Sequence, residues 1–92
     1  MIRSARHKGL RRLYEDGNSR GVIPEHAAKL RDVLARLDAA SAPSDMDLPG
    51  FRLLSLRGDF ESFWAVTVRA NWRVIFRFAD GDAHDVDYVD YH

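Results

Sequence analysis

The chain has 92 residues, no cysteine, 46% hydrophobic and 11% aromatic residues, and a formal net charge of zero from 14 basic and 14 acidic side chains. These values predict a single domain over residues 1–92 and exclude a disordered chain, a disulfide scaffold and a thiolate metal site. The first residues are charged and no apolar run is as long as a membrane span, so we expect a cytoplasmic protein that contacts no membrane.

The charges are unevenly distributed along the chain. Residues 1–40 hold nine Arg and Lys against five Asp and Glu, whereas residues 79–92 hold five Asp and no basic residue. Arginine outnumbers lysine by twelve to two, and the planar guanidinium of arginine is well suited to phosphate. An Arg-rich proteome would produce the same bias, so the charge alone does not identify a ligand.

Two helices are predicted in the first third of the chain. A helical periodicity covers residues 8–16, and Gly17 supplies a left-handed stop. Pro24 begins a second helix that continues to about residue 40. Residues 41–50 are predicted to be a loop with room for one short helical turn. The apolar positions of the two helices are Leu10, Leu13, Tyr14, Ala27, Leu30, Leu34 and Leu37.

The rest of the chain alternates between apolar and polar residues with a period of two, which is typical of strands buried on one face. Short segments rich in turn residues separate the alternating stretches. Ile2–Ala5 is a candidate for a fifth strand at the edge of the sheet. The four main predicted strands cover residues 51–57, 63–69, 72–78 and 83–89.

The hairpin loops decide which side chains share a face of the predicted sheet. A three-residue loop that pairs Val68 with Trp72 gathers the apolar residues of both strands on one face, and a second three-residue loop over 79–81 adds Val86 and Tyr88. We therefore predict an α+β fold with two N-terminal helices packed on one face of a mainly antiparallel, four- to five-stranded sheet. The opposite face is expected to be a polar concavity that presents Ala65, Thr67, Arg73, Ile75, Arg77, Asp85 and Asp87.

The carboxyl end holds groups suited to proton transfer. Asp90, Tyr91 and His92 follow one another, and histidine titrates near neutrality. A frayed tail is the alternative interpretation. Because the segment directly continues a core strand, we expect it to fold back over the arginine-bearing face and to form one pocket there.

Arg73 is the second candidate, because the alternation directs its guanidinium to the polar face. Two alternatives are a solvated arginine and an arginine paired with Asp87 across the ladder. We expect the guanidiniums of Arg57 and Arg69 to join that of Arg73 around one anion. Three such groups suit a phosphodiester, whose negative charge rises in the transition state. The candidate RNA-binding residues are Arg57, Arg69, Thr67 and Arg77.

Several signals of other chemistry are missing from the sequence. It contains no glycine-rich phosphate loop, no metal-ligand spacing and no serine nucleophile elbow, so no cofactor and no metal are expected. We interpret His26 and His84 as ordinary surface or half-buried residues. Trp64 and Trp72 fall on the apolar face, so we expect them to belong to the core rather than to stack on bases.

Two motifs are distinctive at their spacing: Arg69-Ala70-Asn71-Trp72-Arg73, and Asp87-Tyr88-Val89-Asp90-Tyr91-His92. Together with His7-Lys8-Gly9-Leu10 near the start and Leu56-Arg57-Gly58-Asp59 in the middle, they resemble the HigB branch of the RelE-type toxins. These are the toxin halves of type II toxin–antitoxin pairs, also called plasmid maintenance system killer proteins. The resemblance covers the whole chain.

The resemblance implies a compact RelE-like fold and a metal-free endoribonuclease that cuts mRNA in the ribosomal A site. It also implies inhibition by a helix-turn-helix, HigA-like antitoxin, through which such toxins mainly oligomerise. Asp90, Tyr91 and His92 match the catalytic group of the family at the carboxyl end, and Arg73 matches its phosphate-stabilising arginine. Arg57 stands where relatives often have lysine.

Leu54 departs from the pattern of the family, because relatives frequently carry histidine at this position. Without an imidazole at this position, Asp90 and His92 would have to carry more of the proton transfer.

In the expected reaction the ribose 2′-hydroxyl attacks the adjacent phosphorus, while Tyr91 orients a nucleotide. Leu54 and the zero net charge also leave open a rival hypothesis, a non-catalytic module that binds RNA or a partner protein within a toxin–antitoxin complex.

Overall fold

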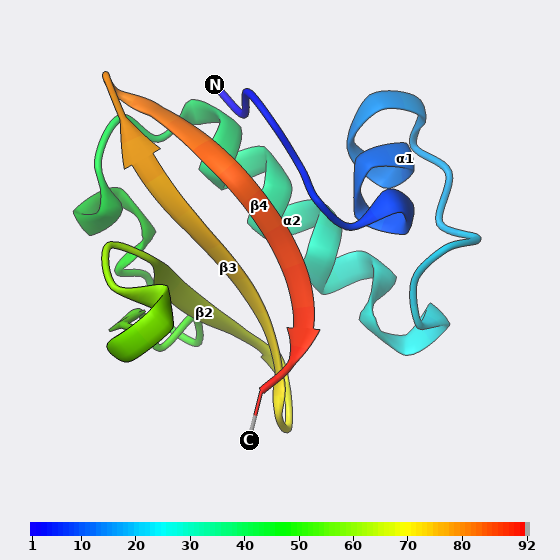
Figure 1. Ribbon diagram of the computed structural model, residues 1–92. Helices are drawn as coiled ribbons and strands as arrows, with labels where there is room; N and C mark the ends of the chain where they lie inside the picture. The colour runs from blue at the N-terminus through cyan, green and yellow to red at the C-terminus, as the bar shows by residue number, and fades with distance from the viewer. Residues whose placement is uncertain (92) are drawn as a thin grey trace.

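The computed structural model describes residues 1–91, in which two α-helices and a four-stranded antiparallel sheet make an α+β fold (Figure 1). The strands lie in chain order, β1-β2-β3-β4. Helix α2 crosses behind the sheet, and α1 lies beyond the edge that β4 forms (Figure 1). With η marking a short 3-10 helix, the elements are α1 (Lys8–Asp16), η1 (Pro24–His26), α2 (Ala27–Ala39), η2 (Pro43–Met46), β1 (Leu54–Ser55), η3 (Gly58–Phe60), β2 (Trp64–Arg69), β3 (Trp72–Ala79) and β4 (Asp82–Asp90).

Helix α1 has the predicted bounds, and its two ends show why. At the N-terminus, Nδ1 of His7 accepts a hydrogen bond from the N–H of Leu10 at 3.1 Å, which satisfies one of the unpaired donors of the first turn. At the C-terminus, Gly17 adopts a left-handed φ of 69°. Gly9 packs against Gly21 so closely that a Cβ on Gly9 would lie 2.1 Å from the carbonyl oxygen of Gly21. The first helix is therefore fixed directly against the chain that leads into η1.

The second helix is also confirmed, except that its first turn is the 3-10 helix η1, after which α2 continues to Ala39. The predicted short helical turn in the following loop is η2. The carboxylate of Asp45 caps η2 by accepting hydrogen bonds from the N–H groups of Ser41 and Ala42 at 3.0 and 3.3 Å. The side chains of α2 that are buried are Ala27, Leu30, Val33, Leu34 and Leu37.

Two hydrophobic clusters lie on opposite faces of the sheet. The main cluster joins buried residues of both helices to one sheet face and includes Leu10, Leu30 and Phe76. Trp64 and Trp72 are half-buried against this cluster, as predicted. The second cluster lies on the other face, which we call the open face and define by Ala65, Thr67, Arg73, Ile75 and Arg77. The open face is therefore less polar than predicted, because the expected Ala65 and Ile75 are joined in its middle by Leu56, with Phe63 and Val89 packed around them.

Both predicted hairpin loops were one residue too long, yet the predicted faces are correct. The β2–β3 pairing follows the predicted register as far as Thr67 and Arg73, and then an extra residue at Val68 allows Arg69 to pair with Trp72 around a two-residue turn. The β3–β4 turn is also two residues long, and β4 carries its extra residue between His84 and Asp87. Such bulges absorb one residue without turning the rest of the strand over.

The predicted strand over 51–57 is reduced to Leu54–Ser55. Arg52 has a left-handed φ of 52°, which interrupts the extended chain. Phe51 lies in the main cluster and Leu56 in the second cluster, on the other side of the sheet, as alternation along an extended chain predicts. The carbonyl oxygen of Phe51 still accepts a hydrogen bond from the N–H of Thr67 at 2.7 Å.

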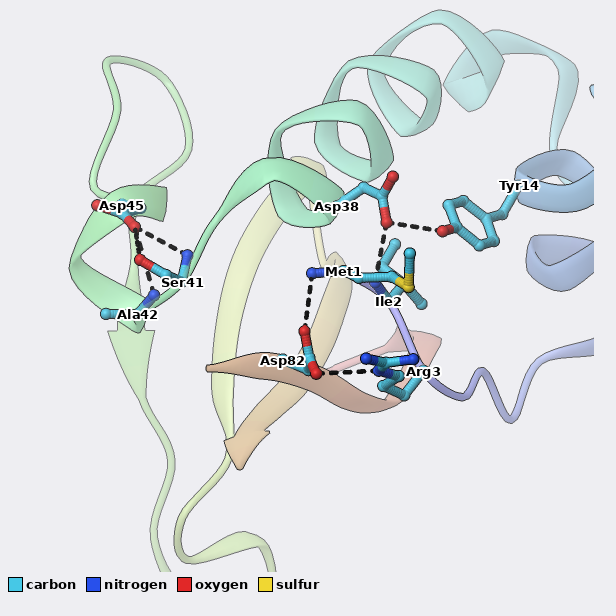
Figure 2. Close-up of polar contacts among 9 residues, drawn as sticks. All are labelled: Met1, Ile2, Arg3, Tyr14, Asp38, Ser41, Ala42, Asp45 and Asp82. Atoms are coloured by element: carbon cyan, nitrogen blue, oxygen red, sulfur yellow. Dashed lines mark hydrogen bonds and ion pairs between the residues drawn. The ribbon is translucent and has the colours of Figure 1, made fainter. Parts of the chain in front are cut away.

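The expected edge strand over Ile2–Ala5 is present only as two parallel bridges to β4, at Ala83 and Val86. A polar arrangement, the N-terminal clasp, fixes this segment and is formed by Met1, Ile2, Arg3, Tyr14, Asp38 and Asp82 (Figure 2). Asp38 Oδ1 accepts hydrogen bonds from Tyr14 Oη at 2.6 Å and from the N–H of Ile2 at 2.9 Å. Asp82 accepts from the amino group of Met1 at 3.1 Å and from Arg3 Nε at 2.9 Å.

Within residues 1–91, no helix is long and apolar enough to cross a membrane.

Candidate active site

The candidate site lies at the end of the sheet where β2 turns into β3 and where β4 finishes (Figure 1). Side chains of paired residues in neighbouring strands share a face of the sheet. One row across the sheet, Thr67–Arg73–Val89, therefore lies on the open face. The next row, Arg69–Trp72–Asp90, lies on the face of the main cluster. The predicted site residues are thus divided between the two faces at one end of the sheet.

Arg73 is fixed by backbone carbonyls and not by a carboxylate. Its Nη1 donates to the carbonyl oxygen of Ala70 at 2.6 Å and to that of Trp72 at 3.2 Å. Asp87 pairs with Ile75 instead, so the alternative of an Arg73–Asp87 ion pair was wrong. Among the described residues Arg73 forms no ion pair, and its Nε and Nη2 make no hydrogen bond. A half-buried guanidinium with two free donor groups is available to an external anion.

As far as Tyr91, the chain continues along the sheet and does not fold back over it, which corrects the sequence-based expectation for Asp90 and Tyr91. Strand β4 continues to Asp90, and the N–H of Tyr91 then donates to the carbonyl oxygen of Asn71 at 2.8 Å. By alternation along the strand, Tyr91 belongs to the open face with Val89, and it is 40% exposed. The third predicted catalytic residue, His92, lies outside the described residues.

The β2–β3 turn, Ala70-Asn71, connects these two groups. Its first carbonyl accepts from Arg73 and its second from Tyr91. Ala70 has a left-handed φ of 51°, which is unusual for a residue with a Cβ and costs backbone energy. The turn therefore places the Arg73 guanidinium and the backbone of Tyr91 side by side.

Arg57 and Arg69 lie at opposite ends of β2. Arg69 is the last residue of the strand, exposed, and paired with Trp72 on the face away from Arg73. Arg57 is exposed at the start of η3, before the strand begins. Neither forms an ion pair with another described residue. Arg57, Arg69 and Arg73 are thus uncompensated cations, but the strand pairing does not gather them on one face.

Arg77, by contrast, is compensated by a carboxylate. Its Nε lies 2.7 Å from Oδ2 of Asp85, and Nε of Arg6 lies 3.6 Å from Oδ1 of the same side chain. The hydrogen bond from Arg77 and the charge of Arg6 hold the pKa of Asp85 below its ordinary value. Arg77 is therefore less available to a phosphate than Arg73. Thr67 is half-buried in the same row as Arg73.

Leu54 lies on the open face, paired with Ala65 in the row next to that of Arg73. It is 53% exposed, which is unusual for a large aliphatic side chain next to two polar rows. This is the position at which the family resemblance predicts histidine. An imidazole here would face the same side of the sheet as Arg73.

A buried aromatic group supports the site from behind. His26 Nδ1 lies 2.6 Å from Tyr88 Oη, and the Tyr88 ring packs on Trp72 with centroids 4.7 Å apart. Burial raises the pKa of the Tyr88 hydroxyl. The expectation that His26 is a surface or half-buried residue was wrong, since it is buried. Its spacing of four residues from the buried Leu30 was the signal in the sequence that could have placed it in the core.

The described residues include no group of three or more His, Cys, Asp or Glu side chains placed to hold a metal ion. The chemistry that the site offers is that of a free guanidinium, a carboxylate, a phenol and, from the sequence, a histidine. Such groups bind an anion and transfer protons.

Comparison with known proteins connects this arrangement to one family. Residues 3–92 match the family described as the RelE-like toxin of the type II toxin–antitoxin system HigB. The chain is 41% identical over 92 residues to a protein named Endoribonuclease HigB from Proteus vulgaris, an alignment that covers 100% of both chains. It is 34% identical over 97 aligned positions to Toxin HigB-1 from Vibrio cholerae serotype O1, covering 100% of this chain and 98% of the relative.

Proposed function

The chain belongs to the HigB-like family of RelE-like toxins from type II toxin–antitoxin systems, and on this premise we propose that it is a ribosome-dependent endoribonuclease that cleaves translated mRNA. A toxin of this type has an antitoxin partner, and we propose that this partner is a helix-turn-helix, HigA-like protein. Its other partners are then the ribosomal A site and mRNA in the cytoplasm. The name of the Proteus relative supports the nuclease activity.

The proposal includes a single RelE-like domain over residues 1–92, with both helices against one face of the sheet. The main hydrophobic cluster supports this packing, since it contains side chains of α1, α2 and the sheet. Assembly into larger complexes would then depend mainly on the antitoxin.

One observation carries the catalytic assignment. The Ala70-Asn71 turn binds the Arg73 guanidinium through one carbonyl and the backbone of Tyr91 through the next. Arg73, which has no carboxylate partner among residues 1–91, is thereby next to the segment that supplies Asp90, Tyr91 and His92. Donors held in advance where negative charge develops stabilise a transition state most effectively.

In the proposed reaction the ribose 2′-oxygen forms a bond to the adjacent phosphorus and the bond from phosphorus to the 5′-oxygen breaks. Asp90 or His92 accepts the 2′-hydroxyl proton, and His92 donates a proton to the leaving 5′-oxygen. The products are a 2′,3′-cyclic phosphate and a 5′-hydroxyl end. Arg73, with Arg57, holds the charge of the pentavalent intermediate, while Tyr91 orients a nucleotide. Arg69, Thr67 and Arg77 are the remaining proposed RNA contacts.

Dependence on the ribosome is proposed from the family, and Leu54 is consistent with it. A protein that lacks an imidazole at this position has fewer groups with which to position and deprotonate the 2′-hydroxyl. Ribosomal RNA can supply the positioning by holding the message with its reacting atoms in line, and positioning alone contributes substantially to the rate.

The test is primer extension on mRNA from a purified translation reaction. The proposal predicts new 5′ ends only when protein, message and ribosomes are all present, and the same ends in single-turnover reactions after EDTA treatment of the toxin. New ends on free mRNA would contradict the dependence on the ribosome. Stalled translation without new ends would support the rival hypothesis of a non-catalytic binding module.

A further inference from the structure

The surface at and around the open face has exposed apolar side chains, of which the proposed reaction uses only Tyr91. Four large hydrophobic side chains are exposed among the described residues, namely Met1, Leu54, Phe60 and Tyr91. Leu54 and Tyr91 belong to the open face. Phe60 is connected to that face through Phe63, because the two rings meet edge to face with centroids 5.9 Å apart. Phe63 in turn packs against the second hydrophobic cluster.

Phe63 is covered on this surface, but Phe60 is not. The guanidinium of Arg6 lies 5.6 Å from the centre of the Phe63 ring, and Phe63 is half-buried. Phe60 is 38% exposed and makes a single ring contact, with Phe63. A short 3-10 turn, η3, thus holds an aromatic ring in solvent at the border of an apolar surface.

The charges around Phe60 indicate which part of an RNA it would meet. The segment 57–62 contains one cation, Arg57, which the proposed reaction assigns to the cleaved phosphate, and two carboxylates, Asp59 and Glu61, so it has no further positive charge for the phosphate of a second nucleotide. Arg73, at the other end of the open face, has no carboxylate partner in the part of the chain that the structure describes. The phosphate is therefore best held at Arg73, and the apolar ring is left for an uncharged base.

The spacing shows that this base belongs to a different nucleotide from the one that is cleaved. Phe63 lies directly before β2 and four residues before Thr67, which corresponds to about 13 Å along an extended chain. Phe60 lies beyond Phe63 in the loop. A single-stranded RNA with its cleaved linkage at Arg73 would have to continue over the second cluster to reach this ring.

We propose that Phe60 is a base-stacking residue that binds a flanking nucleotide of the single-stranded RNA substrate, next to the apolar surface of Leu54 and Phe63. This inference rests on the proposed function for the identity of the substrate. Stacking on an aromatic ring accepts any base, so Phe60 contributes to RNA affinity and not to codon choice. It is a positioning residue, remote from the reacting atoms.

The test measures binding and cleavage separately. The binding probe is a fluorescent, single-stranded ribo-oligonucleotide made non-cleavable by 2′-deoxy substitutions. Phe60→Ala and Phe60→Leu should weaken binding about 5- to 160-fold, because stacking contributes about 1–3 kcal/mol per base. Phe60→Tyr keeps the ring and should bind within about twofold of wild type. On programmed ribosomes the maximal cleavage rate should be unchanged, while the half-saturating toxin concentration rises by the same factor for Ala and Leu.

Unchanged RNA affinity of Phe60→Ala would overturn the inference, as would full affinity of Phe60→Leu, which keeps apolar bulk without the ring. Weaker antitoxin binding with unchanged RNA binding would also overturn it and would identify a protein contact. The outcome is separable from the proposed function. A wild-type protein that binds the probe through Phe60 without cutting mRNA refutes only the nuclease, whereas cleavage that is indifferent to Phe60 refutes only the stacking.

Discussion

The two polar regions of the molecule use charge in opposite ways. In the N-terminal clasp, each carboxylate accepts hydrogen bonds from two donors, so that Asp38 and Asp82 connect segments that are far apart in sequence (Figure 2). At the β2–β3 turn, Arg73 binds only carbonyl oxygens. Carbonyls orient a guanidinium without cancelling its charge. The clasp is therefore organised for stability, and the turn is organised to receive an external anion.

Removal of His92 should produce the largest effect on the turn region. His92→Ala should lower the cleavage rate about 10²–10⁴-fold, as expected for the loss of a well-placed general acid. Quantitative primer extension on translated mRNA measures the change. His84→Ala, a half-buried histidine in the row of Arg77, is the matched control and should cleave at nearly the wild-type rate. A His92→Ala protein as active as wild type would remove histidine from the mechanism.

Arg73→Ala should have the next largest effect, a loss of about 10²–10³-fold in cleavage, which is typical for one preorganised donor to a transition-state charge. Arg73→Lys should recover only part of this activity, because an ammonium keeps the charge but lacks the planar fork. Arg31→Ala, which changes an exposed arginine of α2, is the control. If Arg73→Ala and Arg73→Lys cleave as well as Arg31→Ala, the Arg73 guanidinium contributes no more to cleavage than an ordinary surface arginine.

Leu54→His should increase activity by about tenfold, below the 10²–10⁴-fold range of an acid or base in ideal geometry. The physical reason is that Leu54 is exposed on the face of Arg73, in the neighbouring row. Single-turnover cleavage as a function of pH measures the gain, which should follow the titration of an imidazole. Leu54→Ala tests whether mere removal of the leucine is sufficient, and an equal gain for that variant would refute the imidazole explanation.

A substitution in the N-terminal clasp should lower the free energy of unfolding and leave the cleavage rate unchanged. Tyr14→Phe removes the 2.6 Å hydrogen bond to Asp38 and should lower the free energy of unfolding by about 1 kcal/mol at pH 7, since the site is partly exposed. Urea denaturation measures this loss, and the cleavage rate per folded molecule should stay at the wild-type value. A variant with wild-type stability would show that the clasp contributes nothing.

The pH dependence sharpens the same prediction. The hydrogen bond to Asp38, followed by burial, raises the pKa of Tyr14 from 10.0 to about 12. A raised pKa in the folded state means that the stabilisation is complete below pH 10 and is lost as the pH rises through about 12. The difference in unfolding free energy between wild type and Tyr14→Phe should thus be constant up to pH 10 and should then shrink. A difference that is constant up to pH 11 would contradict this linkage.

The sequence was sufficient to predict the two helices, the three long strands and the side chains that share each face of the sheet. A hydrophobic periodicity remains visible when a strand contains one extra residue. The extra residue at Val68 and the extra residue between His84 and Asp87 leave the apolar side chains on one face, so the faces were correct although both loop lengths were wrong. The kink at Arg52 was not predictable, since no glycine marks its left-handed φ. His26 was predicted to lie at the surface or half-buried because a polar residue at the start of a helix is usually exposed. Its buried hydrogen-bond partner, Tyr88, could not be identified from the sequence.

Sequence reasoning selected the candidate site residues, but it misplaced the carboxyl end and did not predict the charge pairing. Arg73 and the carboxyl end were found by alternation and by the resemblance of their motifs to one family. The compensation of Arg77 depends on Asp85, which lies in the bulged part of β4. The alternative pairing of Arg73 with Asp87 followed from a register with a three-residue loop and no bulge. Ion pairs across a sheet depend on single-residue shifts that periodicity does not resolve.

The most direct test of the central claim is a double-mutant cycle between Arg73→Ala and His92→Ala, measured as single-turnover mRNA cleavage on programmed ribosomes. If both side chains act on one transition state at the turn, the double variant should be scarcely slower than the slower of the two single variants, because residues that act as a unit are strongly non-additive. Losses that multiply in full would show that the two residues act independently and would contradict the account.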